Sequence, residues 1–446
     1  MASALLAGLL GLLPPAASAQ PALTGYAEPY VAVQAGGDGA VLAGRTRARL
    51  DVTAPFDRGA LAIRNEVTYD LLADSLDVVL REATLDVYGL VGGRVDLRAG
   101  HQILVWGETD GAFITDLLAP LDLTEFLAQP QERLRLAVTA AQAAAYLGDV
   151  VVEAVWVPVS PTSRLPAAGS PWDPAPTSLV PLQGPPIPVV RTPHDRPDAR
   201  LASSEGAVRL TWSGLPLTDL ALLAHTGTGR VPGFAVRPTL SLLEGLRIEV
   251  TPTYRRRVAV GATVETAALD PFVLRGEAAY ETATLVPEHL PDSPLDLLDP
   301  ALEASVERGF VLERPQVQAA VTAERLFSGH LVRLTALGRW VLDADEQVAA
   351  EAFQPSLVGV WTRSFRRETL TARALLFWTL GEGLWASPSL TYALRDALNL
   401  EVGAQVFEGL GEAAEPLVPG LSASPNSLFA LYDANDLVYA RLRYSF

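Results

Sequence analysis

The sequence predicts an all-β fold: a single transmembrane antiparallel β-barrel of about 18–20 strands, with short helical elements in its loops. Three observations predict it: side chains alternate between apolar and polar, the apolar runs are short, and the last strand ends on an aromatic residue. A helix needs about 20 consecutive apolar residues to cross a bilayer, and no such run occurs after the N-terminus. A barrel strand presents only every second side chain to lipid, which requires alternation.

The alternation is clear in several segments. Within residues 44–52, the charged Arg45, Arg47 and Arg49 alternate with apolar or small residues, and residues 61–70 and 94–103 repeat this pattern. A period of two residues places successive side chains on opposite faces of a strand. A soluble β-sandwich also alternates, but it rarely sustains the pattern along some 400 residues, so the segments are interpreted as barrel strands.

The connections alternate between tight turns and long loops, as in bacterial barrels, where the short turns are periplasmic. Long connections are expected at 105–132, 160–204, 284–314, 343–355 and 409–436. Tight turns are expected near residues 55–58, 90–93, 148–149, 214–216, 244–245, 268–271, 328–329, 366–367 and 395–396. Counting strands between these alternating turns and loops predicts roughly 20 strands, with 18 as the alternative. An even number of strands places both termini on the periplasmic side.

Both ends of the chain carry targeting signals. Residues 1–19 have a short apolar core and an Ala-Ser-Ala cleavage site, which predicts a signal peptide and a mature barrel of residues 20–446. The final strand alternates up to Tyr444 and Phe446, as in barrels recognised by the outer-membrane assembly machinery. A buried N-terminal helix and an ordinary edge strand are the alternatives. Together, the two signals predict the outer membrane of a Gram-negative bacterium.

Two loops have structure of their own in this interpretation. Residues 160–204 contain eleven prolines and predict an extended outer loop. In the outer loop 284–314, Asp299 suits a helix N-cap, Pro300 the first helical position and Gly309 the helix end. Each loop either folds over the barrel mouth or stays solvated at the surface.

Residues 105–132 are expected to fold inward and narrow a pore. After a strand that reaches Trp106, Gly107 breaks the pattern, and the apolar residues at 113, 114, 117 and 118 need burial. Lipid does not accept the accompanying acids without cost, so the interior is the favoured place. The residues assigned to this constriction are Trp106, Glu108, Asp110, Asp116 and Asp122.

This segment resembles an outer-membrane porin-like family, domain of unknown function 1302. Members share Gly-(Arg/Lys)-Gln-x-x-x-Trp-Gly-Glu followed by Asp-x-x-x-Pro-x-Asp; alginate-export porins have a related pattern. The resemblance extends through residues 156–158 and 272–277, and His101 departs from it where a basic residue is usual. It implies a barrel with constricting loops, no established substrate, and an envelope transport partner for lipids or hydrophobic compounds. The matching residues are Gly100, Gln102, Trp106, Gly107, Glu108, Asp116, Pro120 and Asp122.

Charged residues opposite the apolar face are expected to line the lumen. They form either a basic ladder that guides anionic or amphipathic solutes, or a wall in which Arg and Glu neutralise each other. The second interpretation is favoured because acids are numerous on the same strands. These residues are Arg45, Arg47, Arg49, Arg64, Glu66, Glu82, Arg94, Arg98, Arg275, Glu277, Arg333, Arg339, Arg373, Arg441 and Arg443.

The sequence favours a passive channel over an enzyme. A net charge of −17 disfavours nucleic acid as a partner, and the absence of cysteine removes thiolate metal sites and a cysteine nucleophile. The five histidines offer no convergent nucleophile and base. No catalytic residue, metal or cofactor is therefore assigned. The expected partners are outer-membrane lipid, the assembly machinery and a small solute that is hydrophobic or anionic. The alternatives are a structural or adhesion barrel, a component of a lipid-transport system and, less favoured, an outer-membrane hydrolase.

Overall fold

The computed structural model describes residues 20–36, 38–109, 113–125, 128–173, 178–179, 187–193, 203–241, 245–291, 299–410, 429 and 432–446. The predicted signal peptide, residues 1–19, lies outside the described residues, as does Asp110. Within the described residues, no helix is both long and apolar enough to span a membrane.

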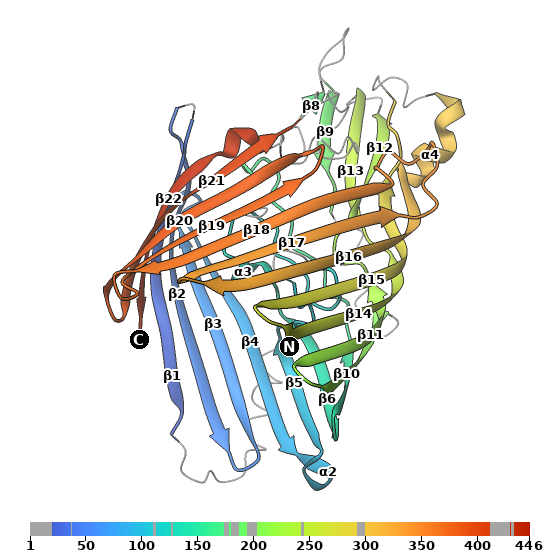
Figure 1. The fold of residues 1–446 in the computed structure, drawn as a ribbon. Coiled ribbons are helices and arrows are strands. Elements are labelled where there is room, and N and C mark those ends of the chain that lie inside the picture. The colour runs from blue at the N-terminus through green and yellow to red at the C-terminus, as the bar shows by residue number, and fades with distance from the viewer. Residues whose placement is uncertain are drawn as a thin grey trace.

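The fold is an antiparallel barrel of 18 strands, closed by pairing of the first strand with the last (Figure 1). The predicted barrel is thus confirmed, with 18 strands rather than 20. The barrel strands are β1 (Ala22–Gln34), β2 (Val41–Phe56), β3 (Gly59–Asp70), β4 (Ser75–Gly89), β5 (Val95–Gln102), β6 (Val138–Leu147), β7 (Val150–Val157), β10 (Glu205–Leu215), β11 (Thr218–Thr228), β14 (Arg256–Leu269), β15 (Phe272–Pro287), β16 (Val311–Phe327), β17 (His330–Val341), β18 (Phe353–Phe365), β19 (Leu370–Thr379), β20 (Gly383–Arg395), β21 (Leu398–Gly409) and β22 (Leu437–Ser445).

The predicted periplasmic turn at 244–245 is wrong, which explains the count of 20. Strands β12 (Gly233–Ser241) and β13 (Gly245–Thr253) form a hairpin outside the barrel wall. They share a second, four-stranded sheet with β8 (Ser178–Leu179) and β9 (Ile187–Arg191), in which β13 pairs with β9 in parallel. Their apolar residues, including Ile248 at 0% exposure, pack into a separate core. A hairpin within a long loop has the same alternation as a barrel hairpin.

The other eight predicted tight turns lie between paired barrel strands. The turn after β4 is assigned as α2 (Leu90–Gly93), but left-handed φ angles of 49° at Val91 and 71° at Gly92 show that it is a turn rather than a helix. Both ends of the described chain lie at this short-turn end, since the Gly25 amide donates to the Phe446 carbonyl at 2.9 Å. Both termini therefore lie at the end of the barrel where the sequence predicted them, beside the short turns.

Side chains alternate between an outward apolar face and an inward polar face. On β16, Val321 is 59% exposed whereas the neighbouring Thr322 is 0% exposed. The Thr322 hydroxyl lies 2.7 Å from the Thr335 hydroxyl of β17 on the inner face. Outside, Trp340 and Phe353 stack with ring centroids 4.7 Å apart. Cross-strand pairs of this kind stabilise a sheet by about 0.2–1 kcal/mol each.

The helix predicted in the 284–314 loop is present. The Asp299 carboxylate accepts a hydrogen bond from the Ala301 amide at 2.8 Å, at the start of η3 (Pro300–Leu302). The chain continues as α4 (Glu303–Arg308) and ends at Gly309, whose φ of 72° suits glycine. Two further short elements are α3 (Gln131–Leu134) and η4 (Asp433–Asn435). Val306 of α4 and Phe310, two residues after the helix, pack on the four-stranded sheet.

Candidate functional site: the internal segment and the passage beside it

The connection between β5 and β6 folds into the barrel. We call its described residues 103–109, 113–125 and 128–137 the internal segment, and its α3 lies inside the ring of strands (Figure 1). Leu117 and Leu118 are each 2% exposed and pack in one cluster with Leu223 of β11 and Ala259 of β14. Burying a leucine side chain contributes about 1.5–3 kcal/mol, so these contacts hold the segment against the inner wall.

Asp116 ties the start of this segment into a closed loop. Its Oδ1 accepts hydrogen bonds from the backbone amides of Trp106 and Gly107, both at 2.8 Å, and its Oδ2 accepts from Arg135 Nε at 2.9 Å. A Cβ on Gly107 would lie only 3.1 Å from the Asp116 carboxylate, so glycine fits here best. Trp106, Gly107 and Asp116, three residues of the motif shared with the porin-like family, therefore act together to shape the segment.

Glu277 of β15, the strand next to β14, anchors the same segment to the barrel wall. Its carboxylate accepts hydrogen bonds from the hydroxyls of Thr109 and Thr115 and from the Thr115 amide. All three side chains are buried. Glu277 was predicted to face the lumen, and in the structure its inward carboxylate lies under the segment as a hydrogen-bond acceptor.

The remaining motif acids also have structural partners. Glu108 accepts a hydrogen bond from Arg209 of β10 at 2.7 Å. Asp122 accepts from the Thr124 amide and hydroxyl at 3.1 and 2.6 Å, and Arg164 lies 3.9 Å away. The predicted constriction residues thus position the segment, while Asp110 lies outside the described residues.

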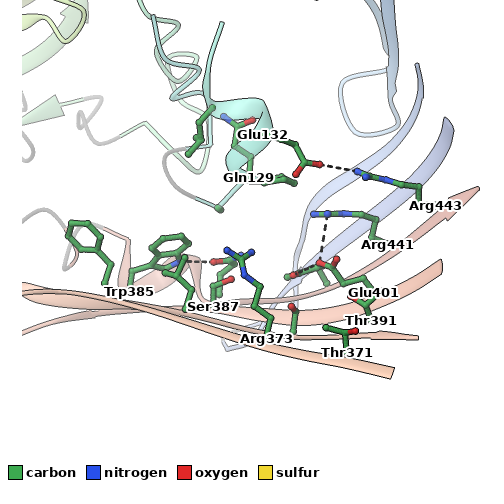
Figure 2. A pocket seen from close by; sticks show the side chains of 18 of the residues that line it. Gln129, Glu132, Thr371, Arg373, Trp385, Ser387, Thr391, Glu401, Arg441 and Arg443 are labelled. Atoms are coloured by element: carbon green, nitrogen blue, oxygen red, sulfur yellow. Dashed lines mark hydrogen bonds and ion pairs between the residues drawn. The ribbon is translucent and has the colours of Figure 1, made fainter. Parts of the chain in front are cut away.

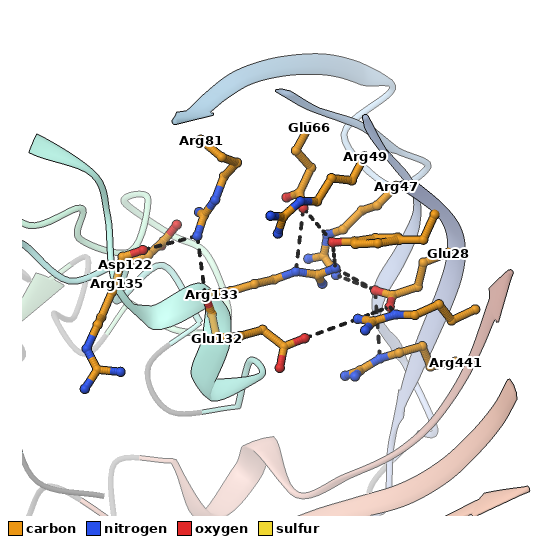
Figure 3. A network of polar contacts seen from close by, with 12 residues as sticks. Glu28, Arg47, Arg49, Glu66, Arg81, Asp122, Glu132, Arg133, Arg135 and Arg441 are labelled. Atoms are coloured by element: carbon orange, nitrogen blue, oxygen red, sulfur yellow. Dashed lines mark hydrogen bonds and ion pairs between the residues drawn. The ribbon is translucent and has the colours of Figure 1, made fainter. Parts of the chain in front are cut away.

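A cluster of arginines surrounds Glu28 of β1 at the seam where β1 meets β22 (Figure 3). Glu28 is 0% exposed and accepts hydrogen bonds from Arg133 Nη2 at 2.8 Å and from Arg443 Nε at 2.7 Å. Arg47 and Arg441 lie 3.7 and 3.9 Å from its Oε1. Glu28 and Arg133 were not predicted from the sequence. Glu28 could have been predicted from its position on the lumen-facing side of the first strand. The residues around Arg133 carry no pattern that would predict its role.

Burial and charge shift the pKa values of one group in the internal segment and one in the loop between β19 and β20. Burial alone would lower the pKa of Arg133, but Glu28 raises that pKa above its ordinary value, so Arg133 stays charged. In the loop between β19 and β20, burial raises the pKa of the Glu382 carboxyl to about 7. The first group is a fixed charge that holds the segment, and the second titrates near neutral pH.

A cavity of about 670 Å³, which we call the passage, lies between the internal segment and the inner wall of β18–β22 (Figure 2). Four arginines line it, Arg135, Arg373, Arg441 and Arg443, against two glutamates, Glu132 and Glu401. One part of the wall is apolar and aromatic, with Phe377, Trp385 and Tyr439. The passage therefore combines an excess of positive charge with an apolar surface.

Most predicted lumen charges have partners. Directly opposite residues in register include Glu28 with Arg47, Arg49 with Glu66, and Arg333 with Glu324. The described ion pairs join Arg45 to Asp70 and Glu125, Arg49 to Asp51, Arg64 to Glu82, Arg98 to Asp86, Arg275 to Glu265 and Glu324, and Arg333 to Glu324. On these strands the arrangement is that of a neutralised wall.

Arg373 differs from them. Its lumen neighbours in register are Thr362 of β18 and Ser389 of β20, so no acid lies directly opposite. It forms no ion pair with the described residues while lining the passage. Arg339 also lacks a described ion pair, and its Nε is buried without a hydrogen bond. Arg94 lies exposed at the end of the turn before β5, because the strand begins only at Val95.

No group of three or more metal-ligating side chains occurs among the residues that the structure describes. The geometry shows a membrane-type barrel, a segment folded into it and a charged passage between segment and wall. This is the architecture of a closed β-barrel with one connection folded into its interior.

Solved structures of porins share this fold. The chain is similar to OccAB4 and OccAB3 of Acinetobacter baumannii, with 9% and 6% identity and TM-scores of 0.52 and 0.50, covering 97% and 96% of this chain and 100% of each neighbour. It is also similar to OccK2 (OpdF) of Pseudomonas aeruginosa in complex with glucuronate, with 11% identity, a TM-score of 0.50 and coverage of 96% and 97%. At these identities the likeness shows the fold, and the predicted outer-membrane location agrees with it.

No family model matches the chain. No curated protein matches it either. The resemblance to domain of unknown function 1302 and to alginate-export porins is therefore not confirmed.

Proposed function

We propose that this protein is a passive channel that lets small anionic solutes cross the outer membrane through the passage beside the internal segment. The observation that carries the proposal is the guanidinium of Arg373, which forms no ion pair with the described residues, in a passage lined by four arginines and two glutamates. Rings and clusters of like charge set the ion selectivity of pores. Because the passage has low-dielectric walls, an uncompensated positive charge there attracts anions more strongly than it does in bulk water.

The apolar part of the passage suits solutes with a carbon skeleton rather than simple inorganic ions alone. Trp385 is 9% exposed and donates a hydrogen bond to Gln405 at 2.5 Å, which fixes its ring beside Phe377 in the wall. A solute with one anionic end and a compact organic body would contact both surfaces. The bound glucuronate of OccK2, a neighbour in fold, is an organic anion and supports this class.

Ion selectivity after reconstitution tests the proposal. Purified protein is reconstituted in a planar bilayer that separates two KCl solutions differing tenfold in concentration. The reversal potential should have the sign expected for a pore that is more permeable to chloride than to potassium. Arg373→Gln should shift that potential toward zero, because it removes this cation from the passage. Arg373→Lys keeps the charge and should retain most of the selectivity.

Arg58→Gln is the matched control, since Arg58 lies exposed in the turn between β2 and β3 and is absent from the passage lining. It removes the same charge and should leave the reversal potential unchanged. A wild-type barrel that conducts no ions, or one that prefers cations, would overturn the proposed function.

A further inference from the structure

A cluster of cationic and aromatic side chains lies on the outward face of the barrel at the short-turn end of β16–β18. It comprises Arg325, His330 and Arg363 with Phe272, Phe327, Trp361 and Phe365 around them. We call these seven residues the outer-rim cluster. None of them lines the passage, so the channel function does not account for them.

The strand register places the cluster outside the barrel. Arg325 pairs with Val332, and Val332 pairs with Trp361, while Phe327 pairs with His330 and His330 with Arg363. These positions share the face of Val321 and Leu334, which are 59% and 62% exposed. The intervening Glu324 points inward, where it binds Arg275 and Arg333.

The two guanidinium groups are held by aromatic rings rather than by carboxylates. Arg325 is exposed, and its Cζ lies 5.3 Å from the ring centroid of Phe272 and 5.8 Å from that of Phe327. Arg363 Cζ lies 4.8 Å from the ring centroid of Phe365, and its Nη1 lies 2.7 Å from His330 Nε2. Cation–π contacts orient a guanidinium but do not neutralise its charge.

Among the residues that the structure describes, no acid compensates these arginines on the same face. Among the described residues of β15–β19, the outward positions near the cluster carry apolar, small or aromatic side chains, and the adjacent acids Asp270 and Glu368 lie in turns. Neither acid forms an ion pair with Arg325 or Arg363 in the structure, and neither arginine has another described acidic partner. At the rim, near the membrane interface, a lipid-facing arginine costs at most about 1 kcal/mol, and an anionic headgroup beside it would stabilise its charge.

We propose that the outer-rim cluster binds the headgroup phosphate of an anionic phospholipid in the periplasmic leaflet. Arg325 and Arg363 would contact the phosphate, Trp361 and the phenylalanines would lie at the level of the glycerol backbone, and the acyl chains would lie along Val321, Val332 and Leu334. Basic side chains beside a bilayer attract anionic lipid, and aromatic rings favour the membrane interface. Each strand is fixed by pairing on both sides, so the site is preformed.

Native mass spectrometry of the delipidated protein in non-ionic detergent tests this site. Palmitoyl-oleoyl phosphatidylglycerol should remain bound at concentrations where phosphatidylcholine of the same chains does not. Arg325→Gln and Arg363→Gln should each weaken phosphatidylglycerol binding about fivefold, the factor expected for one basic residue near an anionic lipid surface. The double Lys variant, Arg325→Lys with Arg363→Lys, should retain most of the binding.

Arg58→Gln is the control at the same rim, because it removes one exposed arginine that contacts none of these rings. Heat-modifiable gel mobility verifies that each variant is folded, and the single variants suffice if the double one does not assemble. Equal binding of the two lipids, an equal loss in Arg58→Gln, or unchanged binding in both Gln variants would overturn the proposal. Displacement of the lipid by millimolar inorganic phosphate would instead identify a site for free phosphate and also overturn it.

Discussion

Arg133 of the internal segment donates a hydrogen bond from Nη2 to Oε1 of Glu28, at 2.8 Å, across 105 residues of sequence. Arg133 is 5% exposed and Glu28 is 0% exposed, so little water screens the pair. Because Glu28 also binds Arg443 of β22, one carboxylate joins the segment to both strands of the barrel seam. The position of the segment, and with it the width of the passage, depends in part on this contact, beside those of Asp116 and Glu277.

Replacing Arg133 with methionine should loosen the segment without unfolding the barrel. Glu28 keeps Arg443 as a partner, so the loss is about 1–3 kcal/mol, typical of a buried hydrogen bond to a charged group. We expect higher single-channel conductance with more frequent fluctuations. Arg164→Met is the control, since Arg164 has a 49% exposed side chain 3.9 Å from Asp122 and should change the conductance little. An unchanged current trace for Arg133→Met would show that the contact does not hold the segment.

Stability should depend on pH through Glu382. Its pKa is raised from 4.5 to about 7, so the folded state binds this proton more tightly than the unfolded chain does. Its stabilising effect is therefore present below about pH 4.5 and is lost as the pH rises to about 7. The thermal unfolding temperature in detergent should fall less between pH 5 and 8 in Glu382→Gln than in wild type. Glu346→Gln, a change at an exposed loop acid, should behave like wild type. Parallel curves for wild type and Glu382→Gln would refute the assignment.

Phe446→Ser should reduce outer-membrane levels in cells, while the purified variant refolds in detergent almost as well as wild type. Phe446 is 54% exposed and its backbone bonds to Gly25, so losing its ring costs only about 1–3 kcal/mol of apolar burial. A large cellular effect would then reflect recognition by the assembly machinery. Val438→Ser removes an apolar group that is 50% exposed on the same strand and should assemble normally. Equal surface abundance of Phe446→Ser and wild type would contradict the role of the C-terminal aromatic.

The barrel could be predicted from the sequence because alternation and turn chemistry are local. Residues 44–52 and the turn at 328–329 have the same pattern in the sequence and in the structure. The turn at 244–245 was assigned incorrectly for the same reason: a hairpin alternates whether it closes a barrel or pairs with β9 in an outer sheet. Only long-range pairing separates these cases.

The site could be predicted only in part. Trp106, Glu108 and Asp116 mark the internal segment, but whether they contact solute or backbone depends on how that segment folds, and the structure shows Asp116 bound to backbone amides. Arg373 was among the expected lumen residues. In the structure Arg373 lies opposite two uncharged residues, Thr362 and Ser389, whereas Arg333 lies opposite Glu324. This difference follows from the cross-strand register, which cannot be read from the pattern of residues along one strand.

Cysteine labelling can determine whether solutes cross between the internal segment and β18–β22. The chain has no cysteine, so Ser389→Cys introduces a single thiol in the passage, directly opposite Arg373. Leu390→Cys places a matched thiol on the outward face, where Leu390 is 47% exposed. We expect the anionic reagent 2-sulfonatoethyl methanethiosulfonate to reduce the current of Ser389→Cys, and to react faster than its cationic trimethylammonium analogue, while Leu390→Cys is unaffected. An unchanged current through fully modified Ser389→Cys would contradict this route for the solutes.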